Sequence, residues 1–303
     1  MECQLEQSLG QAQSITASYV GTEGKKLSLM ESYNLTGLSP LFSTILQFQN
    51  GPGSNYNALQ LQYKRQALRG LQVIAGYTWS HAIDWDSTEA GGETPQRGNS
   101  DNDVRHNFTA ALVYNLPTQY TDRWQRAILG GWSTDLHYVA RTGFPVQVNG
   151  PTITDPVTGL SYDVRLNYNG KNPYVHANGI PGGRQFNPAV FSIPTAAQGA
   201  NGNGPRNFLR GFGEQEADLS IQRVFPIYDQ IHLQFRAEAF NVANHPNFGA
   251  ISDTCGATAA GAVCNSPVMG QALNTLSSAL GTLSSIYQQG GPRSLQLALK
   301  LQF

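Results

Sequence analysis

The sequence predicts an all-β protein: an antiparallel up-and-down transmembrane β-barrel portion of about nine strands, with short periplasmic turns and long extracellular loops. Three observations support this prediction. Apolar and polar residues alternate in about nine segments, as expected for strands that bury one face. Several segments approach about ten residues, the length of a tilted strand that crosses a bilayer, rather than about five. Short and long connections alternate between the segments, which is the asymmetry of outer-membrane barrels.

The C-terminal segment, residues 293–303, shows the clearest alternation. Its apolar residues are separated by Ser, Gln, Ala and Lys, and the segment ends on an aromatic ring. We expect it to be the barrel-closing strand, with one apolar face and one mostly polar face. The apolar positions are Leu295, Leu297, Leu299, Leu301 and Phe303.

The remaining segments repeat the pattern along the chain. They are expected at residues 2–9, 15–19, 59–64, 71–79, 108–114, 132–141, 217–225 and 231–239. Two short connections, at residues 66–70 and 226–229, lie between neighbouring segments. Longer ones follow the segments that end near residues 79, 141 and 239. The sequence therefore predicts short turns at one end of the sheet and long loops at the other.

Period two alone does not separate a membrane barrel from a soluble β-sandwich, because both bury one strand face. Strand length and the aromatic residues near strand ends, such as Trp132 and Phe225, favour the membrane. Two arginines interrupt the apolar face, Arg65 and Arg223, and both lie beside short turns. A long cationic side chain there reaches the headgroup region. The lipid interpretation is therefore preferred.

Composition limits the functional classes. Only 13% of the 303 residues are charged, and 32 glycines and 16 prolines indicate many turns and loops. The net charge of −1 gives no reason to expect a nucleic-acid partner. No apolar run of about eighteen residues predicts a transmembrane helix. We find no catalytic constellation and no zinc spacing among the six histidines, so we expect neither an enzyme nor a bound cofactor.

The chain has three cysteines, too few for a disulfide scaffold. Cys255 and Cys264 bracket a stretch of small residues. A bridge between them would close a short loop in an oxidising compartment, and the alternative is two unpaired thiols. Cys3 is left over.

Polar residues of the central and later strands are expected to face the barrel lumen. Opposite charges on neighbouring strands, such as Asp218 and Arg236, are candidates for ion pairs; the alternative is that they only keep the lumen hydrated. The predicted lumen-facing set is Asp135, His137, Arg141, Asp218, His232, Arg236 and Glu238.

Acidic residues also gather where one strand ends and the next begins. The set is His81, Asp84, Asp86 and Glu89, followed by Asp101 and Asp103. Loop carboxylates can bind Ca²⁺, but the spacing and the glycine of an EF-hand are missing, so a solvated loop is the preferred interpretation. Residues 202–210 (GNGPRNFLR) lack the strand-to-helix context of a phosphate loop and are expected at the base of a long loop.

Five stretches together resemble the barrel of Oar-like TonB-dependent receptors, in the same order and with similar spacing. YTWSHAID and FNVANHPNFG are the most specific parts. The stretches are YNALQLQYKRQALRGLQVIAGYTWSHAIDW (56–85), RHNFTAALVYNLP (105–117), GGWSTDLHYVARTGFPVQV (130–148), FRAEAFNVANHPNFG (235–249) and GPRSLQLALKLQF (291–303). The resemblance covers most of residues 10–303.

The resemblance implies a location in the outer membrane of a Gram-negative-type bacterium and energised uptake of a nutrient. It also implies three partners: outer-membrane lipid, the barrel-assembly machinery and the TonB system. Receptors of this class have a signal peptide, a plug and a barrel of about twenty-two strands. We therefore expect residues 1–303 to be the C-terminal part of the barrel domain, with the signal peptide, plug and N-terminal barrel part absent. A small self-closing outer-membrane surface or adhesion barrel and a secreted carbohydrate-binding β-sandwich are the alternatives.

Overall fold

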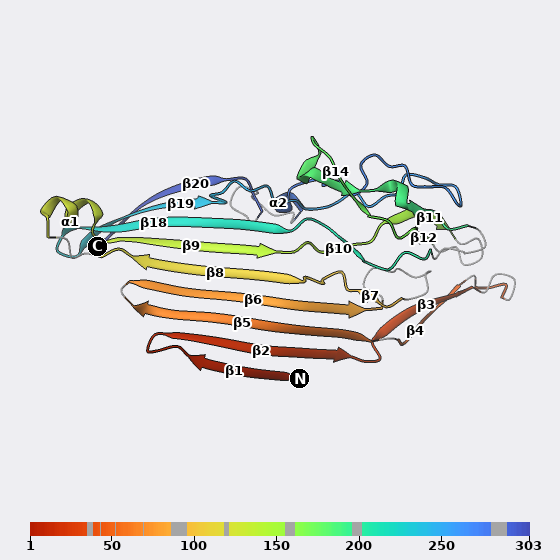
Figure 1. Ribbon diagram of the computed structural model, residues 1–303, viewed down its shortest axis with the longest axis horizontal. Helices are drawn as coiled ribbons and strands as arrows, with labels where there is room; N and C mark the ends of the chain where they lie inside the picture. The colour runs from red at the N-terminus through yellow and green to blue at the C-terminus, as the bar shows by residue number, and fades with distance from the viewer. Residues whose placement is uncertain are drawn as a thin grey trace.

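One large antiparallel sheet dominates the protein in the computed structural model (Figure 1). The structure describes residues 1–34, 39–42, 44–51, 53–68, 70–85, 96–117, 121–154, 161–195, 202–279 and 290–303. Among these residues, no helix is long and apolar enough to cross a bilayer.

The long strands of this sheet lie side by side in chain order, so the predicted up-and-down topology is confirmed. All nine predicted segments form strands. They are β1 (Glu2–Ser8), β2 (Gln13–Gly24), β5 (Ser54–Leu68), β6 (Leu71–Asp84), β8 (His106–Asn115), β9 (Trp132–Arg141), β18 (Glu214–Tyr228), β19 (Ile231–Phe240) and β20 (Ser294–Gln302). The short β7 (Gly98–Asn99) pairs with the end of β6.

Several strands are longer than predicted: β5 and β18 have 15 residues each and β6 has 14. The alternating pattern marks only the stretch with one apolar face. Towards the long-loop end the strands continue where the apolar face itself becomes polar, as at Asn55 and Asn57 in β5, which lie on the same face as Leu59. Register shifts also carry β5 and β18 past their predicted ends. The connections that follow are therefore shorter than predicted, because β5 extends to Leu68 before β6 begins at Leu71, and β18 extends to Tyr228 before β19 begins at Ile231.

The two ends of the sheet differ as predicted. Residues 9–12, 69–70, 116–131 and 229–230 connect strands at one end, on the left in Figure 1. Residues 25–53, 85–105, 142–213 and 241–293 connect them at the other. The short-turn end carries a helix that the sequence pattern did not predict, α1 (Arg123–Leu129). One tight turn requires glycine: Gly70 has a φ of +81°, and a Cβ there would lie 2.4 Å from the Asn115 carbonyl oxygen.

The pairing register separates an apolar face from a polar face. One row across four strands is Leu136, Leu219, Ala239 and Leu295. The adjacent row is Asp135, Ser220, Glu238 and Gln296. On β20 the leucines of the apolar face are exposed in the chain. Because side chains alternate between faces along every strand, each face runs across the whole sheet.

The main buried hydrophobic cluster lies outside this sheet. Among the described residues, every member of the cluster belongs to residues 142–213 or 241–293. In the part of the chain that the structure describes, no second layer therefore packs on the apolar face of the sheet, as a β-sandwich would require. The sheet also has two edges, since β1 pairs only with β2 and β20 only with β19 in the described part of the chain.

The long loops contain short paired strands and short helices of their own, which the alternation of apolar and polar residues does not predict. The first long loop forms β3 (Ser28–Asn34) and β4 (Thr44–Asn50). In the third long loop, residues 142–213, four pairs of short strands form. They are β10 (Pro145–Val146) with β17 (Leu209–Arg210), β11 (Asn149–Thr154) with β12 (Ser161–Arg165), β13 (Asn167–Tyr168) with β16 (Phe191–Ser192), and β14 (Tyr174–His176) with β15 (Arg184–Phe186). The 3₁₀ helices are η1 (Pro181–Gly183) and η2 (Pro188–Val190), and the last loop contains α2 (Leu276–Ala279).

Candidate functional site

Two long loops, residues 142–213 and 241–293, fold against each other at one end of the sheet. We call their described residues the loop module. A single hydrophobic core holds it together, and the backbone N–H of Phe186 donates to the Met269 carbonyl across the two loops (3.0 Å). The core members are Val148, Val164, Leu166, Phe186, Val190, Phe191, Ile193, Leu209, Cys255, Cys264 and Met269. The loops are therefore a packed unit rather than irregular connections.

A disulfide joins Cys255 and Cys264 inside this core. Both cysteines are buried, and their Cα atoms are 4.8 Å apart. The bridge closes the short loop that the sequence indicated. Cys3 has a free, exposed thiol on β1. The disulfide thus stabilises the loop module without connecting it to the sheet.

Replacing Cys255 and Cys264 together by Ser is expected to destabilise the loop module by about 2–3 kcal/mol, because a short covalent loop is lost from the unfolded state. Native-state hydrogen exchange of the Phe186 amide measures this change. The matched control is Cys3→Ser, which should leave that exchange rate unchanged. Equal exchange rates in the double variant and the parent would contradict a structural role for the bridge.

Buried ion pairs attach the loop module to the sheet. Asp103, at 0% exposure, accepts hydrogen bonds from the Ala82 backbone N–H (2.7 Å) and the Arg105 Nε (3.0 Å). Arg210 of the loop module binds the same carboxylate. Arg206 pairs with Asp84 at the end of β6 and donates to the Asp84 carbonyl (2.7 Å). These contacts connect residues 202–213 to β6 and to the start of β8.

These ion pairs correct the sequence interpretation of the acidic loop. Asp84 and Asp103 are held by arginines, so a solvated loop is wrong for these two residues. Asp101 accepts from the Asn207 side-chain amide at 2.6 Å. His81 contacts the Asn99 side chain at 3.1 Å. Asp86 and Glu89 lie outside the described residues, and no group of three or more candidate metal ligands occurs in the part described.

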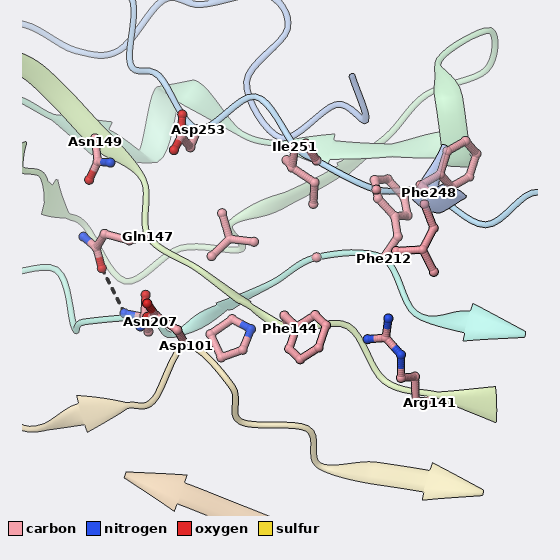
Figure 2. A pocket seen from close by; sticks show the side chains of 16 residues that line it. Asp101, Arg141, Phe144, Gln147, Asn149, Asn207, Phe212, Phe248, Ile251 and Asp253 are labelled. Atoms are coloured by element: carbon pink, nitrogen blue, oxygen red, sulfur yellow. Dashed lines mark hydrogen bonds between the residues drawn. The ribbon is translucent and has the colours of Figure 1, made fainter. Parts of the chain in front are cut away.

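A cleft of about 450 Å³ opens in the loop module, and Asp101 and Arg141, the last residue of β9, complete its lining. Figure 2 shows an aromatic end, with Phe144, Phe212 and Phe248. The rings of Phe212 and Phe248 are 4.9 Å apart between centroids. The opposite end is polar and is lined by Asp101, Gln147, Asn149, Asn207 and Asp253. The cleft therefore suits a solute that has both an apolar part and hydrogen-bonding groups.

Asp253 contributes, together with Asp101, to the charge of the polar end. Burial raises the pKa of its carboxyl group above the usual value, and the nearby Asp163 raises it further, while a hydrogen bond from its own backbone N–H acts in the opposite direction. The group consequently becomes an anionic acceptor at a higher pH than a solvated aspartate does. A ligand that donates hydrogen bonds or carries positive charge would favour this anionic form.

Arg141 connects the cleft to the polar face of the sheet. Its Nε is 2.5 Å from the Glu214 carboxylate, and these two residues face each other in neighbouring strands. The guanidinium also lies 4.5 Å from the centroid of the Phe144 ring. A second cavity of about 510 Å³ shares Arg141, Phe212 and Phe248 with the cleft. The site is thus continuous with the polar face.

The structure places the seven predicted lumen-facing residues on one face of β9, β18 and β19, as the register requires. The suggested Asp218–Arg236 pair is wrong. Arg236 instead pairs with Glu238 on its own strand (2.6 Å), and Asp218 accepts from the Asn241 backbone N–H (2.8 Å). The reason is register, since Arg236 lies opposite Gln222 and Asp218 lies opposite His137.

Comparison with known families separates the membrane barrel from the soluble β-sandwich. The family model described as an outer membrane beta barrel domain matches residues 1–296. The chain belongs to this family. No curated protein matches it. The protein is therefore located in the outer membrane, and the predicted fold class is confirmed. The part of the predicted identity that the family match supports is the outer-membrane barrel domain.

Because the chain belongs to this family, each of the two faces of the sheet can be assigned an environment. Hydrocarbon covers the apolar face, which explains why large apolar side chains are left exposed there. In barrels of this kind the polar face of such a sheet lines the lumen. The loop module and the cleft lie at the end with long loops, which is extracellular in barrels of this kind. The short turns and α1 lie at the periplasmic end.

Proposed function

We propose that this chain forms part of the wall of an Oar-like TonB-dependent receptor, which takes up a nutrient with energy from the TonB system. In this proposal the receptor moves its solute without chemical change. The stretches 56–85 and 235–249 support the family, because they resemble that receptor barrel most closely. A self-closing surface barrel is less favoured, since the two sheet edges do not pair with each other in the described residues.

The cleft beside Arg141 is the observation that supports the proposal most directly. A receptor must capture solute outside the cell and release it towards the lumen. The cleft opens among extracellular loops, and Arg141 with Glu214 continues it onto the lumen-facing side of β9 and β18. Binding residues on loops that a rigid scaffold holds in place are common in proteins.

The cleft indicates the kind of solute. Three phenylalanine rings at one end favour an apolar or ring-shaped portion. Carboxylate and amide oxygens at the other end, including those of Asp101 and Asp253, favour hydroxyl or ammonium donors. The proposed solute is therefore amphipathic, with a donor-rich end.

The proposal includes further strands of the same receptor. Unpaired strand edges are not tolerated in hydrocarbon, because each unsatisfied backbone group costs several kcal/mol. The edges of β1 and β20 would pair with additional barrel strands, and a plug would fill the lumen against the polar face. Assembly of such a wall would require the barrel-assembly machinery.

Binding of the periplasmic domain of TonB tests this proposal. The intact gene product, in phospholipid vesicles with the periplasmic side outward, is expected to bind the purified domain saturably. A receptor that depends on TonB must contact it on that side of the membrane. An unrelated outer-membrane porin in the same vesicles is the control. Failure to bind above the porin level would contradict the transport proposal and leave the outer-membrane barrel assignment intact.

A further inference from the structure

The helix α1 (Arg123–Leu129) leaves its largest apolar side chains uncovered. Trp124 is 75% exposed and Ile128 is 62% exposed, and Leu129 lies beside them. Trp124 and Ile128 are four residues apart, so they lie on the same side of the helix. A seven-residue helix that buried an apolar face within the chain would not show this exposure.

Hydrogen bonds at its two ends hold α1 in place. The Asp122 carboxylate accepts from the backbone N–H groups of Trp124 (2.7 Å) and Gln125 (3.2 Å). At the other end the Gly130 N–H donates to the Arg126 carbonyl (3.1 Å). Helices this short are marginal without such support. The caps explain how α1 forms while its apolar side remains available to a partner.

The last turn of α1 is bonded to residues of the lipid-facing surface. The Ile128 carbonyl accepts from the Trp132 indole (2.8 Å) and from the Arg223 guanidinium (3.0 Å). Trp132 and Arg223 lie opposite each other on the apolar face of β9 and β18. The Trp132 ring also packs edge-on against Phe235. The exposed side of α1 is therefore continuous with the surface that hydrocarbon covers.

Arg223 indicates the depth of α1 in the membrane. Its guanidinium stacks on the Phe225 ring (4.6 Å to the centroid) and on the Trp132 ring (5.5 Å). A cation at the bilayer centre is costly, so this group must lie near the headgroups. The bond from Arg223 to Ile128 places the helix at the same level. In Figure 1, α1 projects beyond the strands at the short-turn end.

We propose that α1 is an interfacial anchor that binds phospholipid at the periplasmic leaflet of the outer membrane. Trp124, Ile128 and Leu129 insert among the upper acyl carbons. An amphipathic helix of this kind lies in the plane of the interface, with arginines towards the phosphates. Arg123 and Arg126 of α1 and the neighbouring Arg223 give this end of the sheet its positive charge. The anchor sets the depth in the membrane at which β9 begins.

Photocrosslinking tests the anchor in the intact gene product in a Gram-negative host. The photoreactive residue p-benzoylphenylalanine replaces Trp124 in one variant and Ile128 in a second. Both positions are exposed, so the probe requires no repacking. The same probe replaces Leu299 on the apolar face as the positive control and Gln296 on the polar face as the negative control.

Illumination is expected to attach phospholipid at positions 124, 128 and 299, and not at 296, as mass spectrometry of the labelled peptides would show. Protein adducts at 124 and 128 would overturn the proposal and identify α1 as a docking surface for a periplasmic partner. Lipid at 299 without lipid at 124 and 128 would also overturn it, because the helix would then be solvated. The test does not depend on TonB.

Discussion

Replacing Asp103 by Ala is expected to weaken the attachment of the loop module to the sheet by about 3–5 kcal/mol. The carboxylate is fully buried and binds Arg105 and Arg210. Its removal leaves two guanidinium groups without their common anion and the Ala82 backbone N–H without an acceptor. The Gly211 backbone N–H, next to Arg210 in the chain, donates to the Phe144 carbonyl (2.8 Å), and its native-state hydrogen exchange measures the free energy of local opening.

The matched control for this prediction is Glu23→Ala. Glu23 pairs with Lys25 at 3.1 Å, but both side chains are largely exposed. Exposed ion pairs contribute about 0–1 kcal/mol, so exchange at Gly211 should hardly change in the control. If Asp103→Ala behaved like the control, the ion pairs would not be what holds the loops to the sheet. The cleft would then need another source of rigidity.

Much of the sheet was predictable because lipid-facing strands follow a simple rule. The alternation of Leu295, Leu297 and Leu299 with polar residues reports the environment of each side chain directly. The rule no longer applies where the apolar face becomes polar, as at Asn55 and Asn57, and for this reason the predicted strands are too short. The helix α1 was not predicted, because a seven-residue segment with Asp122 as its cap shows little periodicity.

The candidate site was much less predictable, because its contacts join residues far apart in the chain. Asp103 and Arg210 are separated by 107 positions, and Asp84 and Arg206 by 122. No local pattern indicates such pairs. The acidic residues form a cluster in the sequence, and residues 202–210 are expected at the base of a long loop. Nothing in the sequence indicates that the two are in contact. The cleft depends on this connection.

A strand of an outer-membrane barrel places its apolar face against hydrocarbon, and the lipid-facing assignment of this sheet requires the same. Leu299 and Gln296 are close neighbours on β20 and lie on opposite faces. Arginine at position 299 would place a charge in hydrocarbon, and we expect Leu299→Arg to cost about 2–4 kcal/mol if the residue lies near the bilayer centre. Arginine at position 296 would face the lumen, so Gln296→Arg should be nearly neutral.

The free energy of unfolding of these two variants is the most direct test of this claim. It is measured by urea titration of the intact gene product folded in phospholipid vesicles, with the parent protein as reference. Contact of the apolar face with lipid predicts a loss of stability for Leu299→Arg and almost none for Gln296→Arg. Equal tolerance of arginine at the two positions would contradict it, because the apolar face would then not be in contact with lipid.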